Sequence, residues 1–530
     1  MHRLNDSAWQ YLYAGFIALL AAGLLYHHWQ IIVAPVPLDL YEGTMPLITG
    51  IIAEGNNPYT RAFQPQAADV YPPLYNLLVA PLSLLFGNTF QLHRSVSAVF
   101  IVASSALCGF TAIRNGASRL NGMAVTLLMY AALLFYGTPV SSTNAPGVAL
   151  FLAGLLVPWF CRFGTGSLVF SLLCGLLSFY TKQYFILGMA ILCLYLFLCV
   201  SMRRALLLGT AYATLLLASL VAVHYTSPYY LDNTLFAPAA AVRGLQTWEI
   251  LGLQVRFFLG VYAGLLVAMS IAGFLLAREK GALRNPLTGP GLKGLAGSGL
   301  TGPLLARPLD YFWFCLFWAT VAIVVSLGRN PGNWMTYLFQ LISPFLLLAG
   351  ISLISRSPIR SWVVVPLLVL NFFQAYAILH KDFSVDMHNW REMEQLIAGS
   401  DEVLASQMLV MTLLEQGKTV YQDGHTFYFP LAASKPDWFL KPREEDRVSA
   451  VWNDYMTGIY RKIERREFDL ILVSPWEMRG IFLRNPPPFE EVEGRAFLSR
   501  HYAVERKIEL SMTDRHGGGS YNIQVWRPRG

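Results

Sequence analysis

Two carboxylates near the start of the chain are the strongest candidates for chemistry. Asp39 and Glu42 stand three residues apart in the stretch Asp39-Leu40-Tyr41-Glu42-Gly43, shortly after the first long apolar run. On a helical turn, side chains with this spacing share a face. A carboxylate here could accept the proton of an acceptor hydroxyl as a general base, or hold a divalent cation against a phosphate. A pair of solvated loop acids is the alternative.

Three cationic residues lie at the ends of apolar runs. Arg94 follows His93 near the start of the second run, Lys182 ends the fifth, and Arg329 ends the ninth. Arginine and lysine bind phosphate oxygens through charge-assisted hydrogen bonds. These residues therefore predict a site for a phosphate group. The alternative is that each side chain only reaches up to the membrane interface.

Aromatic and amide side chains accompany these charges along the sequence. Tyrosines also serve as simple anchors at a membrane interface, and the two roles are compatible. We expect the following residues to line a substrate groove: Tyr41, Tyr59, Tyr71, Asn144, Gln183 and Asn333.

The elements that must position these residues are membrane helices. The chain has 530 residues, of which 55% are hydrophobic and 13% charged, whereas soluble proteins have about 25% charged residues. From Trp9 to His380 apolar runs of about 16–24 residues follow one another, and about 20 apolar residues cross a bilayer. The first run lacks a cleavage site and is predicted to stay as an uncleaved helix. Eleven spans are predicted, at about 9–32, 92–113, 120–137, 145–161, 167–181, 184–202, 205–224, 255–277, 309–327, 334–354 and 360–379.

The basic residues between the runs predict the topology. The net charge is +7, but its arginines and lysines sit in alternate short links, which is the positive-inside pattern of a membrane protein and not a nucleic-acid surface. With those links in the cytoplasm, the apolar stretch Tyr71–Phe86 should not cross. It then belongs to one long outer loop, 33–91, and the transmembrane module, 1–380, presents its polar features on the outer face.

From Lys381 onward the charge density is that of a soluble domain, placed outside by this topology. Helices alternating with short apolar strands predict a small α/β layer over 381–530. The expected strands are 402–406, 419–422, 468–473, 503–510 and 521–526, with helices at 408–415 and 448–466. Asp386, His388, Asp423 and His425 are candidate metal ligands, but their spacing matches no recognised site, which favours surface or capping roles.

Taken in order, several of these motifs resemble bacterial members of the GT-C glycosyltransferase superfamily, which includes protein O-mannosyltransferases and the lipid A aminoarabinose transferase. The resemblance covers most of the chain. It rests on Asp39–Gly43, Asn57-Pro58-Tyr59, Tyr71-Pro72-Pro73-Leu74, Gly87…His93-Arg94, Thr181-Lys182-Gln183 and Gly328…Asn333…Tyr337. It implies a multi-helix membrane module with an acidic motif in the first outer loop and a lipid-phosphate-linked sugar donor.

The resemblance also suggests residue roles. Glu42 is favoured as the base, with Asp39 assisting or binding a cation. Lys182 and Arg329, with Arg94 as a third, would meet the donor phosphate. Many relatives have an acid near the start of the fourth span, where this chain has Asn144. That departure puts a second catalytic acid or metal site in doubt.

We therefore expect a multi-pass glycosyltransferase of the plasma (inner) membrane. It would move a sugar from a polyprenyl-phosphate donor to a hydroxyl of a lipid, glycan or protein acceptor at the outer face. No cofactor is certain, and a divalent cation at Asp39 or Glu42 stays open. The alternatives are a multi-span transporter or lipid flippase, which should carry polar residues in mid-helix positions, and a non-enzymatic assembly or sensor protein.

Overall fold

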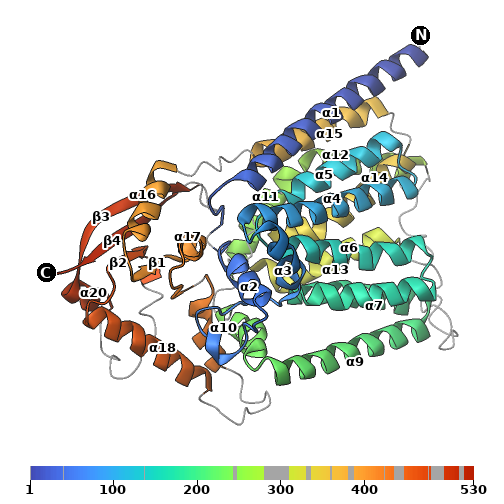
Figure 1. Cartoon of the computed structure of the whole chain (residues 1–530). Coiled ribbons are helices and arrows are strands. Elements are labelled where there is room, and N and C mark those ends of the chain that lie inside the picture. The colour runs from blue at the N-terminus through green and yellow to red at the C-terminus, as the bar shows by residue number, and fades with distance from the viewer. Residues whose placement is uncertain are drawn as a thin grey trace.

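The computed structural model of the chain describes residues 2–39, 41–135, 138–242, 247–279, 310–329, 336–357, 361–379, 387–422, 424–434, 447–475, 477–478, 494–512 and 519–530. Its larger part is a bundle of roughly parallel and antiparallel helices. A mixed helix and strand domain, built from the C-terminal part of the chain, lies against one end of this bundle (Figure 1). The chain is thus organised as an apolar module that carries a polar domain on one end.

Some helices of the bundle begin at polar caps between apolar runs. Thr89, Ser118 and Ser201 each accept a backbone N–H from the first turn of the helix that follows, which satisfies a donor that has no partner inside the helix. The bundle elements are α1 (His2–Val33), α4 (Phe90–Arg114), α5 (Arg119–Leu133), α6 (Asn144–Phe160), α7 (Thr165–Phe179), α8 (Ile186–Tyr195) with the π-helical turn η3 (Leu196–Val200), α9 (Met202–Thr226), α11 (Trp248–Val261), α12 (Ala263–Glu279), α13 (Tyr311–Val325), η7 (Leu338–Ile342) leading into α14 (Ser343–Arg356), and α15 (Ser361–Leu379).

The helices identify a multi-pass membrane protein. Within the described residues, five helices are long and apolar enough to cross a membrane singly, and a sixth span results if α11 and α12 are counted together. Other predicted spans correspond to shorter apolar helices, among them α5, α6, α7 and α13. The total of eleven spans stays a prediction.

The predicted span 255–277 is wrong as a single helix, because α11 and α12 meet at an angle of 72°. A buried asparagine of α15 stabilises the break. Asn371 donates from Nδ2 to the carbonyl of Val261 at 3.2 Å, and its Oδ1 accepts the N–H of Leu265. In an apolar environment, backbone groups released by a helix break must find such partners. Gly264 allows the close approach, since a Cβ there would lie 2.2 Å from the Leu367 carbonyl oxygen.

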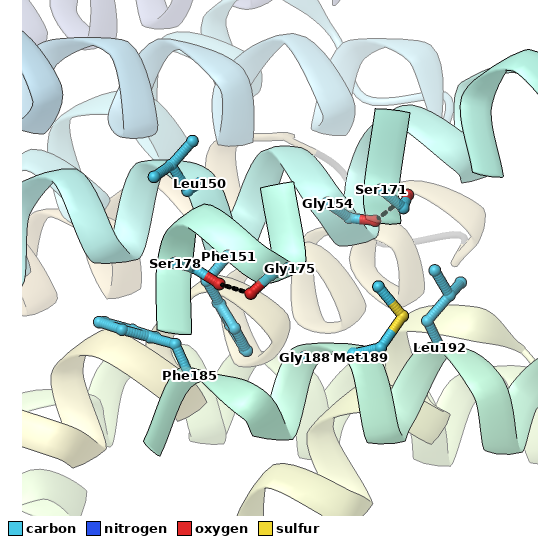
Figure 2. A pocket seen from close by; sticks show the side chains of 10 residues that line it. All are labelled: Leu150, Phe151, Gly154, Ser171, Gly175, Ser178, Phe185, Gly188, Met189 and Leu192. Carbon is cyan, nitrogen blue, oxygen red and sulfur yellow. Dashed lines mark hydrogen bonds between the residues drawn. The ribbon is translucent and has the colours of Figure 1, made fainter. Parts of the chain in front are cut away.

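Small residues bring α6, α7 and α8 together. Ser171 of α7 donates to the carbonyl of Gly154 on α6 at 2.6 Å, and a Cβ on Gly188 of α8 would lie 2.7 Å from the Phe151 ring. The three helices leave only a small crevice between them, lined by residues such as Phe151, Gly175 and Gly188 (Figure 2). This packing matters for the site, because Asn144 opens α6 and Lys182 follows α7.

Several short helices that connect the long ones lie toward the end of the bundle that meets the C-terminal domain. They include α2 (Thr44–Ala53), η1 (Arg61–Phe63), α3 (Leu74–Phe86), η2 (Gln183–Phe185), η4 (Asp232–Phe236), α10 (Ala237–Val242) and η5 (Leu327–Arg329). Figure 1 shows α2, α3 and α10 at this end. Helix α3 has 13 residues, which at 1.5 Å per residue give a length of about 20 Å, less than the ~30 Å hydrocarbon core.

The C-terminal domain contains a four-stranded mixed sheet in the order β1-β2-β4-β3. Strand β1 runs parallel to β2, and β4 is antiparallel to both β2 and β3. The elements are α16 (Met387–Ala398), β1 (Val403–Ala405), η8 (Gln407–Leu409), α17 (Val410–Glu415), η9 (Thr426–Ser434), α18 (Arg447–Glu464), β2 (Leu470–Val473), α20 (Gly494–His501), β3 (Tyr502–Met512) and β4 (Gly519–Pro528). Buried apolar residues such as Leu472, Ile523 and Val525 form the core on the sheet.

One strand prediction in this domain is wrong. The stretch 419–422 has no place in the four-stranded sheet. A side chain connects this stretch to β1, because Gln422 donates from Nε2 to the carbonyl of Ala405 at 2.8 Å. A side-chain contact therefore replaces the backbone ladder that a strand would have formed.

The domain packs closely on the loop that holds the two early acids. Val410 at the start of α17 shares a buried apolar cluster with Ile48 of α2. A Cβ on Gly43 would lie 2.9 Å from the Cβ of Val410, and one on Gly424 would lie 2.5 Å from Cδ1 of Tyr41. The backbone at Gly43 and Gly424 therefore lies directly against side chains across this interface, and glycine is what permits the approach.

Candidate functional site

Lys182 lies in a cage of aromatic rings at the domain end of the bundle. Its Nζ donates to Oδ1 of Asn144 at 3.0 Å and lies 4.5 Å from the ring centroid of Tyr71 and 5.6 Å from those of Tyr184 and Tyr337. The side chain is 8% exposed. Burial lowers the pKa of Lys182 to about 7, against the opposing effect of Asp39 and Asp69. Ring faces stabilise an ammonium without neutralising it, so this group keeps the capacity to bind an anion.

Asp39 lies close enough to Lys182 for each to affect the other's pKa. It is partly buried, and its Oδ1 accepts the backbone N–H of Tyr41 at 2.9 Å. Burial is the main effect that raises the pKa of Asp39 to about 7, and the negative charge of Glu42 also raises it. The N–H of Tyr41 and the charge of Lys182 lower this pKa. A carboxyl group with this pKa is suited to exchanging a proton near neutral pH.

Glu42, predicted as the favoured base, is engaged in a buried ion pair instead. Arg94 donates to it from Nε at 2.7 Å and from Nη2 at 2.8 Å. The backbone N–H of Leu38 adds a bond at 2.7 Å, and Ser141 donates from its N–H at 2.9 Å and from its hydroxyl at 3.0 Å. Burial alone would raise the pKa of Glu42, but the Arg94 charge and these donors lower it below its usual value. This geometry argues against Glu42 as a proton acceptor.

Arg94 has no donor left for a phosphate, which corrects its predicted role. Besides its two bonds to Glu42, Nη1 donates to the carbonyls of Ile31 and Ala34, and Nη2 donates to that of Val36 at 2.7 Å. Arginine carries five N–H donors, and all five are used. Arg94 and Glu42 therefore fix the chain where α1 turns into the outer loop.

Two further residues complete the cluster: Asp69, which was not predicted, and His425, which was predicted only as a candidate metal ligand. Asp69 is fully buried, accepts the backbone N–H of Tyr71 at 2.9 Å and accepts from Nδ2 of Asn76 at 3.3 Å. His425 of the C-terminal domain lies with Nδ1 3.7 Å from Asp69 Oδ1. The position of Asp69 two residues before Tyr71-Pro72-Pro73 was a usable signal. For His425 the sequence favoured a surface or capping role, and nothing local indicated a contact with the outer loop.

The predicted groove residues divide into two groups. Tyr41, Tyr71 and Asn144 contact the charged cluster. Tyr59 and Gln183 lie behind it: Tyr59 donates from its hydroxyl to the Tyr71 carbonyl at 3.0 Å, and Gln183 donates from Nε2 to the carbonyl of Val70 at 3.2 Å. The second group thus supports the segment that carries Asp69 and Tyr71.

Arg329 and the metal candidates are placed only in part. The guanidinium of Arg329 stacks 4.3 Å from the ring centroid of Trp248, at the start of α11. Asn333, Asp386 and Asp423 fall outside the described residues. Within the described ranges, no group of three or more His, Cys, Asp or Glu side chains is arranged to hold a metal ion.

The fold is similar to that of a solved membrane enzyme. ArnT from Cupriavidus metallidurans, solved bound to undecaprenyl phosphate, matches with a TM-score of 0.57 over 97% of this chain and 98% of its own, at 12% identity. The Archaeoglobus fulgidus oligosaccharyltransferase, tethered to an acceptor peptide, matches at 9% identity and a TM-score of 0.46 over 97% of this chain and 74% of its own. No family model and no curated protein matches the sequence. The likeness to ArnT shows that the two chains share a fold, in agreement with the predicted resemblance.

Proposed function

We propose that this chain, with its GT-C fold, is a membrane glycosyltransferase that moves a sugar from a polyprenyl-phosphate donor to an acceptor hydroxyl. The observation that carries the proposal is the pairing of a partly buried carboxyl, Asp39, with the caged ammonium of Lys182 at one end of the bundle. The arrangement supplies a candidate base and a candidate anion site whose charges act on each other. ArnT, which shares the fold, binds undecaprenyl phosphate in its solved structure, and this supports a donor of the same class.

The mechanism assigns the proton acceptor to Asp39. The carboxylate of Asp39 takes the proton of the acceptor hydroxyl as its oxygen bonds to the anomeric carbon of the donor sugar. The bond from that carbon to the phosphate oxygen breaks at the same time, and the electron pair leaves with the polyprenyl phosphate. Lys182 stabilises the charge that develops on this oxygen, because it is already held by Asn144 and the rings before reaction.

Aromatic faces in the site suit a sugar. Tyr41 and Tyr71 present rings beside Asp39 and Lys182, and the C–H faces of a pyranose or furanose pack well on such rings. Arg329 remains a predicted second contact to the donor phosphate. A divalent cation would need carboxylate ligands, and both carboxylate oxygens of Glu42 already accept hydrogen bonds from protein donors.

The sidedness follows from the basic links. With those links in the cytoplasm, the end of the bundle that carries Asp39 and Lys182 faces outward from the inner membrane together with the C-terminal domain. An acceptor that is a lipid, a glycan or a protein could reach it there. The transporter or flippase alternative receives no support from the fold, and the charged cluster lies at a helix end and not along a path through the bundle.

The test is a transfer assay with membranes that contain the chain and a radiolabelled polyprenyl-phosphate sugar. We expect label to move to an acceptor, and we expect Asp39→Asn and Lys182→Met to abolish this transfer. Asp401→Asn and Lys507→Met are matched controls, because both residues are exposed in the C-terminal domain. Movement of the labelled lipid across the bilayer without sugar transfer would contradict the proposal and support the flippase.

A further inference from the structure

His425 enters the candidate site from a domain that lies far from it in sequence. The imidazole is 3% exposed. It stacks on the ring of Tyr41, with centroids 5.3 Å apart and planes within 9°, and it meets the ring of Tyr71 edge-on at 5.2 Å and 86°. A single side chain of the C-terminal domain thus contacts two residues of the outer loop that surround Asp39 and Lys182.

The backbone around His425 is built to hold the ring in this place. Gly424 donates its N–H to Oγ1 of Thr44 at 3.2 Å, and the lack of a side chain at Gly424 lets the turn reach Tyr41. On the other side, Tyr428 donates its N–H to the carbonyl of His425 at 2.8 Å. Phe429 is fully buried in the apolar cluster that joins η9 to Tyr229. The segment is therefore anchored on both sides of the ring.

The charge state of His425 limits the roles that its side chain can have in the site. Burial lowers the pKa of His425 to about 3, and the positive charge of Lys182 adds to the effect. The groups that face it are Asp69, Tyr41, Tyr71 and Tyr428. At neutral pH the imidazole is uncharged, so it contributes as a flat ring and not as an acid or a counterion.

We propose that His425 is a positioning residue for Asp39, acting through the stacked ring of Tyr41. Tyr41 donates its backbone N–H to Oδ1 of Asp39 at 2.9 Å, so the ring that fixes Tyr41 also fixes the orientation of the carboxyl. By covering the loop, His425 further keeps water from Asp39. The C-terminal domain is then part of the active centre. This inference rests on the proposed transfer function.

The experiment compares His425→Ala with His425→Phe in the full-length chain. Phenylalanine keeps a flat ring against Tyr41, whereas alanine removes it. We expect His425→Phe to transfer sugar within about threefold of the parent. Because a misplacement of about 1 Å can cost about 10²-fold in rate, we expect His425→Ala to lose between about 10-fold and 100-fold in kcat with little change in the donor KM.

The pH profile separates positioning from a general loss of folding. Water admitted by His425→Ala should move the pKa of Asp39 back toward about 3.9, so the acidic limb of kcat shifts to lower pH. In His425→Phe the limb should stay near that of the parent. A variant that only folds less well would show a lower kcat at every pH, but the acidic limb of its pH profile would stay at the parent's position.

A second pair of variants tests the same contact from the backbone. Gly424→Ala places a Cβ 2.5 Å from Tyr41, whereas Gly458→Ala on α18 meets no atom within 4 Å. We expect the first to lower kcat and the second to leave it unchanged. If the parent shows no transfer, the proposed function fails. If the parent is active and His425→Ala keeps its kcat and acidic limb, or if His425→Phe is as impaired as His425→Ala, the positioning role is overturned.

Discussion

Replacing Glu42 and Asp39 one at a time separates a structural acid from a catalytic one. Glu42 is 1% exposed and accepts five hydrogen bonds, two of them from Arg94. Glu42→Gln removes the negative charge and leaves a fully buried guanidinium uncompensated. Breaking a buried ion pair from one side costs about 3–5 kcal/mol. We therefore expect a marked fall in the thermal unfolding temperature of the detergent-solubilised protein and a lower yield.

Asp39→Asn should behave in the opposite way. The residue is partly buried and carries a carboxyl that burial makes easier to protonate, so a neutral amide of the same size should leave stability nearly unchanged. Loss of a general base lowers the rate by about 10²–10⁴-fold.

The assay pairs the unfolding temperature with sugar transfer per folded molecule, measured at saturating donor. We expect Glu42→Gln to be unstable and to retain transfer in the fraction that folds, and Asp39→Asn to be stable and inactive. A Glu42→Gln protein with the parent's unfolding temperature and no transfer would refute this reasoning and return the base role to Glu42.

Three further predictions test the cage and the broken span. Transfer should peak near pH 7, because Asp39 must lose its proton and Lys182 must keep its own, and both pKa values lie at about 7. In Lys182→Arg the side chain stays charged, so the profile of kcat against pH should lose its alkaline limb. Tyr71→Leu should weaken donor binding about 2–30-fold, the range of a cation–π contact of about 0.5–2 kcal/mol, whereas Tyr71→Phe should not, as judged by KM. Asn371→Leu should lower the unfolding temperature, since the N–H of Leu265 and a carbonyl lose their partner at about 1–3 kcal/mol each.

The membrane class and the fold could be predicted from the sequence because both depend on features that are visible locally. Apolar runs follow from the length needed to cross a bilayer, and the order of motifs pointed to the GT-C fold. The break at Val261 was missed because the run 255–277 is predominantly apolar along its whole length. What makes the break stable is Asn371, more than 100 residues away.

The site could be predicted as a set of residues but not as a set of contacts. Lys182 and Asn144 were both selected, yet nothing in the sequence pairs residues 38 positions apart. His425 was placed among surface residues because the soluble domain was treated as separate from the loop. Arg94 offered a usable signal: a guanidinium inside an apolar helix must find a counterion, and Glu42 was an available acid on the same face.

The two acids of the first loop show how the environment divides similar side chains between different roles. Glu42 points toward α4 and Ser141, where five donors stabilise its charge and hold its pKa low. Asp39, one turn earlier, lies by the aromatic cage, where burial and the charge of its neighbour Glu42 both raise its pKa. The stabilised carboxylate of Glu42 has a low affinity for a proton, whereas the destabilised carboxylate of Asp39 has a higher one. In the proposed mechanism, the ion pair that keeps Glu42 charged thereby favours Asp39 as the base.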